Sequence, residues 1–181
     1  MKLFLIGYMA SGKTTFGSAL ARHLNVPFID LDNYIEEREK MTVSEIFRTK
    51  GESGFREIEK ETLHSLEEKD NIIIACGGGT PCFFDNMDYI NSKGETVFLE
   101  ASVPVLLRRL IEASSKRPIV AGKSPEEIEE TIKQQLVLRN PYYTKAKIRW
   151  DGEKLESEEE INENIKDFLS AHPFVFSKSF F

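Results

Sequence analysis

The most informative stretch of this sequence spans residues 7–14 and reads Gly-Tyr-Met-Ala-Ser-Gly-Lys-Thr. It satisfies the pattern G-x-x-x-x-G-K-[ST], in which glycines allow a compact loop whose amide groups converge on phosphate oxygens. Lys13 of this pattern reaches the β- and γ-phosphates of a nucleotide, and the hydroxyl of Thr14 ligates Mg²⁺. An apolar run precedes the loop and an amphipathic stretch follows it, so we interpret it as a phosphate-binding loop (P-loop) that opens a helix.

Short apolar runs and helix-length amphipathic stretches alternate around this loop. The apolar runs predict strands at residues 3–6, 27–29, 72–75, 97–99 and 147–150. The amphipathic stretches predict helices at residues 14–24, 31–39, 42–49, 55–66, 103–111 and 126–138. We expect the last helix to end at Arg139, because Pro141 follows it. Strands that alternate with helices are typical of parallel βαβ units, so the sequence predicts an α/β layered domain.

Length and charge bound the class of protein. The 181 residues are enough for one domain with its own core, and the formal net charge is −6. An acidic chain argues against a general nucleic-acid binder and against a protein drawn to an anionic membrane surface. Because no apolar run approaches the length of a spanning helix, we expect no membrane partner.

The two cysteines, Cys76 and Cys82, flank a glycine-rich turn. One structural disulfide in a secreted protein is one interpretation, but the N-terminus lacks the features of a secretory signal. Two thiols without a neighbouring histidine do not complete a zinc site. We therefore expect reduced thiols in a cytoplasmic enzyme.

Two carboxylates, Asp30 and Asp32, follow the second predicted strand. The carboxyl end of a parallel strand faces the crevice in which open sheets hold ligands. One carboxylate suits the shell of Mg²⁺, and the other suits a base that accepts a proton from an attacking hydroxyl. The alternative interpretation is that an aspartate caps the helix that begins here.

Three glycines and two arginines are further candidates for ligand binding. Residues 77–79 are all glycine and follow the third predicted strand, so the backbone can approach a ligand closely and donate its amides to it. Arg56 begins one predicted helix and Arg139 ends another. A flexible turn and two surface arginines with solvated partners are the alternative.

Six motifs, taken in order, resemble those of the shikimate kinases. They are the G-x-M-x-x-G-K-T-T loop at residues 7–15, the D-x-D at Asp30 and Asp32, the F-R-x-x-E at residues 55–59, the triple glycine at residues 77–79, the R-P-[IL]-[VL] at residues 117–120 and the R-N-P-x-Y at residues 139–143. The resemblance implies an α/β, three-layer P-loop kinase fold with a central five-stranded parallel sheet. It also implies a helical substrate-binding region at about residues 31–66 and a mobile lid at about residues 114–124.

The same resemblance implies an activity and a domain organisation. Residues 1–170 are expected to form a single kinase domain, and residues 171–181 a Phe-rich tail that either frays or packs on an apolar patch. The implied reaction is ATP-dependent phosphorylation of the 3-hydroxyl of shikimate, in chorismate and aromatic amino-acid biosynthesis, with ATP as co-substrate and Mg²⁺ as cofactor. We expect a cytoplasmic monomer whose partners are these small molecules, with no nucleic acid and no membrane.

Residue roles follow from the resemblance. Lys13 would contact the transferring phosphoryl group, Asp32 would orient or deprotonate the 3-hydroxyl, and Arg117 would reach the ATP phosphates as the lid closes. The substrate-binding residues would be Asp32, Gly77, Gly78, Gly79, and Arg56 and Arg139 on the substrate carboxylate. The nucleotide-binding residues would be Ala10, Ser11, Gly12, Lys13, Thr14, Thr15, Arg109 and Arg117. The metal ligands would be Thr14 and Asp30.

Two features depart from the family pattern. Ala10 stands where the family often has glycine, and we expect it to be tolerated with a negative φ. Residues 151–167 are unusually acidic, with eight acids against two lysines, a balance equal to the net charge of −6. We therefore expect the acidity to lie in a solvated helix and not at the active site. No adenine contact is assigned in this segment, and spacing does not separate Arg109 from the adjacent Arg108 as a stacking partner for adenine.

Two other functions remain open at this point. A small-metabolite kinase of the gluconate type would also bind a carboxylated polyol. A nucleotide-binding regulatory module without activity would also keep the P-loop, although the lysine, the Mg²⁺ ligand and the base are all present in this chain.

Overall fold

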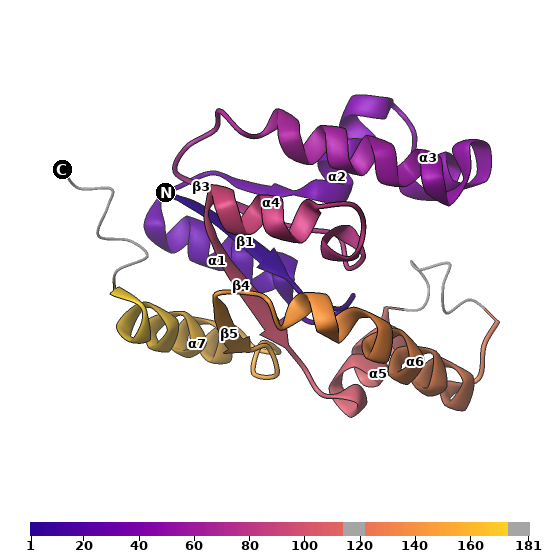
Figure 1. Ribbon diagram of the computed structural model, residues 1–181. Helices are drawn as coiled ribbons and strands as arrows, with labels where there is room; N and C mark the ends of the chain where they lie inside the picture. The colour runs from indigo at the N-terminus through magenta and orange to yellow at the C-terminus, as the bar shows by residue number, and fades with distance from the viewer. Residues whose placement is uncertain (114–121, 174–181) are drawn as a thin grey trace.

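The computed structural model describes residues 1–113 and 122–173. Within them, five parallel strands form one sheet in the order β2-β3-β1-β4-β5 (Figure 1). The strands are β1 (Lys2–Ile6), β2 (Phe28–Asp30), β3 (Ile72–Ala75), β4 (Glu95–Glu100) and β5 (Ile148–Asp151). The central strand β1 pairs with β3 on one side and β4 on the other, and Phe4 lies opposite Ile74 and Thr96. The predicted five-stranded parallel sheet is confirmed.

Helices cover both faces of this sheet. They are α1 (Lys13–Leu24), α2 (Leu31–Glu39), α3 (Val43–Ser65), α4 (Asn86–Lys93), α5 (Val103–Glu112), α6 (Pro125–Tyr143), α7 (Glu158–Ala171) and the short 3₁₀ helix η1 (Thr80–Cys82). Capping boxes begin two of them: Thr42 with Glu45 at α3, and Ser124 with Glu127 at α6.

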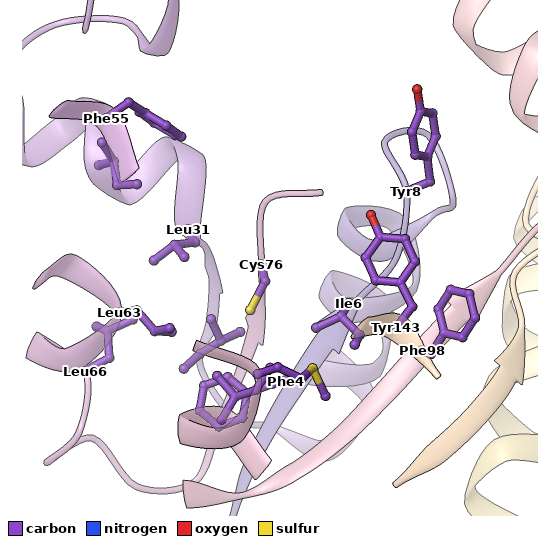
Figure 2. Packing of buried hydrophobic residues seen from close by; sticks show 14 of the residues in the cluster. Phe4, Ile6, Tyr8, Leu31, Phe55, Leu63, Leu66, Cys76, Phe98 and Tyr143 are labelled. Carbon is purple, nitrogen blue, oxygen red and sulfur yellow. The ribbon is translucent and has the colours of Figure 1, made fainter. Parts of the chain in front are cut away.

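The strands alternate their side chains between two apolar clusters, which makes the domain three-layered. Leu3 and Leu5 point into a cluster with residues of α1 and α7. Phe4 and Ile6 point into a larger cluster with residues of α2 to α6, part of which is drawn in Figure 2. Because side chains alternate along a strand, an apolar run buries both of its faces.

Four elements, α3, α4, η1 and α6, differ from the sequence-based expectation. The two helices predicted at residues 42–49 and 55–66 form the single element α3, which is interrupted at Gly51, where φ is 70° and ψ is −179°. Helix α4 and η1 were not expected, because their short sequences carry too few apolar residues for a helical pattern. The expected end of α6 at Arg139 is wrong, because the helix runs on through Pro141 to Tyr143.

The continuation of α6 has a physical reason. Pro141 lacks the N–H group that would bond to the carbonyl of Val137, one turn earlier. Val137 is 73% exposed, so water can satisfy that carbonyl. The helix therefore passes the proline and places Tyr143 on the same face as Arg139.

The sheet order creates the crevice that holds ligands in open parallel sheets. The connection from β1 leads to β2 on one side of the sheet, whereas the connection from β3 leads past β1 to β4 on the other, so the strand order reverses between β3 and β1. The P-loop, Asp30 and the triple glycine all follow the carboxyl ends of β1, β2 and β3. Helices α2 and α3, and α5 and α6 opposite them, extend beyond this edge of the sheet (Figure 1). In the described ranges, no helix combines the length and the apolar character needed to cross a bilayer.

Candidate active site

The P-loop connects β1 to α1, and three of its residues, Gly7, Ala10 and Gly12, have a positive φ. Gly12, at the N-cap of α1, has φ 98°, and Ala10 has φ 63°. Our expectation of a negative φ at Ala10 is therefore wrong. Alternating right- and left-handed residues turn successive N–H groups to one side, which is how such a loop forms an anion-binding concavity. Ala10 adopts the left-handed conformation at a cost of about 1–2 kcal/mol relative to glycine.

Lys13 lies folded against its own loop. Its Nζ donates to the carbonyl oxygens of Gly7 at 3.0 Å and Tyr8 at 2.8 Å. These two carbonyls hold the ammonium at the first turn of α1. Lys13 also lines the cavity over the loop, so its ammonium lies beside the space in which a phosphate could bind.

Thr14 and Asp30 form a pair of oxygen ligands. The Thr14 hydroxyl donates to Asp30 Oδ2 at 2.7 Å. Asp30 also caps α2, because its Oδ1 accepts from the backbone N–H of Asn33. The capping interpretation and the ligand interpretation of Asp30 are therefore compatible. Hydroxyl and carboxylate oxygens are what Mg²⁺ takes from a protein, and it usually fills its other positions with water and phosphate. The residues present fit this ion.

Asp32 lies in the first turn of α2 and faces the cavity. Burial, the largest cause, and the neighbouring carboxylates of Glu59 and Asp30 together raise its pKa to about 6, against the opposing effect of Lys13 and Arg56. A carboxylate with this pKa is ionised at neutral pH but holds its proton more tightly than an ordinary aspartate. Such a pKa suits a group that accepts a proton from a hydroxyl.

Glu59 is the site residue that sequence reasoning missed as a functional group. Its side chain is fully buried, and its two oxygens accept from Arg56 Nη1 at 2.8 Å and from the Thr80 hydroxyl at 2.5 Å. The F-R-x-x-E motif contained the signal, because Arg56 and Glu59 are three residues apart on one helix face. Glu59 fixes the guanidinium of Arg56 and places negative charge near Asp32.

The triple glycine brings three predicted residues together. A Cβ on Gly77 would lie 2.8 Å from Asp32 Oδ1, and one on Gly78 would lie 3.2 Å from Arg139 Nη1. A Cβ on Gly79 would lie 2.5 Å from Arg56 Nη2. Each glycine therefore leaves room for one functional side chain against the backbone. Tyr143 donates to the Gly78 carbonyl at 2.5 Å and fixes the middle of the loop.

The two arginines present guanidinium groups that are held in different ways. Arg56 is 8% exposed, and its guanidinium carbon lies 4.0 Å from the centroid of the Phe83 ring. Arg139 lies over the ring of Tyr8, 5.4 Å from its centroid. Arg139 Nη1 is buried and has no hydrogen-bond partner among the described residues. A buried donor without a partner is costly, and an anionic ligand would satisfy it.

A cavity of about 830 Å³ lies over these residues. Ten of the predicted residues line it: Ala10, Gly12, Lys13, Thr14, Thr15, Asp30, Asp32, Gly77, Gly78 and Arg109. Ser11, Gly79, Arg56 and Arg139 are not among the residues that line it. The thiol of Cys76 also lines the cavity, but burial raises its pKa far above the ordinary value, so it stays protonated. Both cysteines are free thiols.

Residues 9–170 match the sequence profile of the family described as shikimate kinase. The chain belongs to the shikimate kinase family. A shikimate kinase of Bacteroides thetaiotaomicron is 49% identical over 166 residues, which is 92% of this chain and 95% of the relative.

Solved shikimate kinases share this fold. A 1.7 Å crystal structure of shikimate kinase from Bacteroides thetaiotaomicron has a TM-score of 0.93 and 46% identity, covering 96% of this chain and 99% of that one. Shikimate kinase from Acinetobacter baumannii in complex with shikimate has a TM-score of 0.81 and 27% identity, covering 99% and 95%.

In this member of the shikimate kinase family, the structure distinguishes Arg109 from the adjacent Arg108, because only Arg109 of the two lines the cavity. Arg109 lines the cavity and donates to the carbonyls of Ala10, Gly152 and Glu153, whereas the side chain of Arg108 is 52% exposed. Both arginines bond to Glu156, which lines the cavity too. Our expectation that the acidic segment stays away from the active site is therefore wrong for Glu156.

Some predicted features lie outside the described residues. They are Arg117, most of the lid predicted at residues 114–124, and residues 174–181 of the Phe-rich tail. Among the described residues, Trp150 is a packing residue: its ring meets Phe168 edge-on at 5.2 Å, and its Nε1 donates to Asn164.

Proposed function

We propose how the residues of this chain transfer the γ-phosphoryl group of ATP to the 3-hydroxyl of shikimate, the reaction of its family. The observation that carries the proposal is the triple glycine, against which Asp32, Arg139 and Arg56 lie in turn. These three side chains supply one hydroxyl acceptor and two carboxylate donors, which match the two kinds of polar group on shikimate. The P-loop borders the same cavity, so donor and acceptor meet there.

At the nucleotide end, the amides of residues 10–15 hold the phosphates at the positive end of the α1 dipole. Lys13 leaves the carbonyls of Gly7 and Tyr8 and contacts the transferring phosphoryl group. Arg109 borders the adenine, held in place by Glu156 and the carbonyls around it. Arg117 adds positive charge to the phosphates.

Thr14 and Asp30 would hold Mg²⁺ through their side-chain oxygens. Bound there, the ion neutralises charge on the β- and γ-phosphates. The protein contributes the oxygen pair whose members lie 2.7 Å apart.

At the acceptor end, Asp32 accepts a hydrogen bond from the 3-hydroxyl and takes its proton as the oxygen attacks the γ-phosphorus. Its pKa of about 6 leaves it ionised at neutral pH. Arg56 and Arg139 bind the carboxylate of shikimate through their planar donor forks, and Gly78 offers a backbone contact. Positioning and electrostatics are the main contributions that phosphoryl transfer asks of a protein.

We also propose a cytoplasmic monomer made of one kinase domain over residues 1–170. The free thiols of Cys76 and Cys82 suit a reducing compartment. Every proposed site residue comes from a single chain, so the site needs no second copy.

The test replaces the proposed base. Asp32→Asn keeps the shape of the side chain and removes its ability to take a proton, so we expect kcat with shikimate to fall by about 10²–10⁴-fold. The Kd of Mg-ATP, measured by calorimetry, should change less than about twofold because Asp32 lies at the acceptor end. Unchanged turnover in Asp32→Asn would mean that the base is another group.

A further inference from the structure

Tyr8 is a buried polar side chain in the P-loop that the phosphate-binding role of the loop does not use. It occupies a variable position of the G-x-x-x-x-G-K-[ST] pattern, yet only 2% of it is exposed. Its ring belongs to the larger apolar cluster, and Figure 2 draws it beside Tyr143, with both hydroxyls on the same side.

The Tyr8 hydroxyl ties the loop to helix α6. It donates to Gln135 Oε1 at 2.9 Å, across 127 residues of sequence. Gln135, Arg139 and Tyr143 are spaced four residues apart, so they form one row along a face of the helix. At one end of this row, Gln135 accepts the hydrogen bond from Tyr8 of the P-loop; at the other end, Tyr143 donates to the Gly78 carbonyl.

The Tyr8 ring supports the middle member of that row. The guanidinium carbon of Arg139 lies 5.4 Å from the ring centroid, within the range of a cation–π contact. On the other side, Arg139 Nη1 lies against Gly78. The guanidinium is thus enclosed between the ring of Tyr8 and the glycine backbone, with Nη1 buried and lacking a hydrogen-bond partner in the described chain.

We propose that Tyr8 is a positioning residue that holds Arg139 in the orientation that receives the carboxylate of the acceptor. The P-loop then has two functions, because its amides bind the nucleotide while its tyrosine orients the acceptor-binding arginine. The inference rests on the proposed role of Arg139 in acceptor binding. This role distinguishes Tyr8 from an ordinary aromatic residue of the core, whose loss would lower stability and leave acceptor recognition unchanged.

The first test compares Tyr8→Leu with Tyr8→Phe in steady-state assays. Tyr8→Leu removes the ring under Arg139, so we expect the KM for shikimate to rise about 5–10-fold, with kcat and the KM for ATP within about twofold. Tyr8→Phe keeps the ring and loses the bond to Gln135, so it should restore the KM to within about two- to threefold of wild type. Tyr89→Leu, which removes a ring packed on the same cluster, is the matched control and should leave the KM for shikimate unchanged.

The second test asks whether Tyr8 acts through Arg139. In an Arg139→Met background, adding Tyr8→Leu should raise the KM for shikimate no further, because the group it positions is gone. With the methyl ester of shikimate as substrate, which lacks the carboxylate charge, Tyr8→Leu should cost less than about twofold. If Tyr8→Leu does not fold, Gln135→Met takes its place, with an expected two- to threefold rise in KM.

The outcomes separate this inference from the proposed function. A wild-type KM for shikimate in Arg139→Met would remove the role of Arg139 and the inference with it. A raised KM in Arg139→Met together with an unchanged KM in Tyr8→Leu would overturn the inference alone. Additive effects of the two changes would also overturn it.

Discussion

Two requirements on the side chain of Asp32 conflict with each other. The proposed catalytic role needs it ionised at neutral pH, but its surroundings penalise the charge, because burial and the carboxylates of Glu59 and Asp30 raise its pKa to about 6. The neighbours that produce this shift also have structural duties. Glu59 holds Arg56 and Thr80, and Asp30 caps α2. The site therefore gains a tuned base at some expense to stability, a common feature of active sites.

The stability cost should be visible in Asp32→Asn. The pKa of about 6 in the folded protein lies above the ordinary aspartate value of 3.8. Ionisation therefore favours the unfolded state more than the folded one, and this group lowers stability as pH rises from about 4 through 6. Asn does not titrate. We expect urea unfolding to show Asp32→Asn more stable than wild type by about 1–2 kcal/mol at pH 8, shrinking to a few tenths at pH 4. A difference that grows towards low pH would contradict the account.

Glu59 should set the pH at which activity begins. Asp32 must be ionised to accept the proton, so log kcat/KM for shikimate should fall as pH drops through about 6. Glu59→Gln keeps an oxygen for Thr80 but removes a charge that raises the pKa of Asp32. We expect the midpoint of this acid limb to move to lower pH by about 0.5–1 unit. A midpoint that stays in place or moves upwards would show that Glu59 does not tune the base.

The triple-glycine loop is the element that assembles the acceptor site. Gly79 has φ −93° and ψ −16°, which any L-residue can adopt, so its lack of a side chain matters for space alone. The loop depends in turn on α6, which passes Pro141 and so delivers Tyr143 to the Gly78 carbonyl. One helix thereby supplies both a carboxylate donor and the brace behind the loop.

Gly79→Ala tests this packing directly. The added Cβ would lie 2.5 Å from Arg56 Nη2, so the guanidinium must move away from Glu59 or the loop must shift. We expect the KM for shikimate to rise about tenfold, with little change in the KM for ATP, because the strain falls on the acceptor end. Steady-state assays with either substrate varied will measure this. Equal losses for both substrates would mean that the whole loop has rearranged.

The parts of the fold and of the site that depend on residues close together in the chain could be predicted from the sequence. The P-loop, the two aspartates and the five strands were predictable, because spacing and apolar periodicity express them within a few residues. The pairing of each glycine with one side chain was not, since it joins residues between about 20 and 60 positions apart. Gln135 and Tyr8 are likewise 127 residues apart. The left-handed Ala10 was missed because loop curvature, and not residue preference, sets its φ.

At the scale of the whole molecule, the excess of acidic residues lies in one segment of the chain. The charges of residues 151–167 sum to −6, which equals the net charge of the chain. Three of these acids lie in the first turn of α7, where the helix dipole favours negative charge. Glu156 is the exception that reaches the cavity, where it orients Arg109. Lys13 and Arg109 line the cavity beside five acidic residues, and Arg56 and Arg139 lie outside its lining. The positive groups proposed to bind the two anionic substrates are therefore individual side chains placed among carboxylates, so neither the net charge of the chain nor that of the cavity reveals them.

Substrate choice is the most direct test of the account. ADP release is measured with Mg-ATP and, in turn, shikimate, quinate, gluconate and AMP, and the shikimate product is located by ³¹P NMR. The site geometry predicts turnover with shikimate far above the other acceptors, with the phosphate on the 3-hydroxyl. A rate with shikimate no higher than the acceptor-free background, or faster turnover of gluconate, would contradict it.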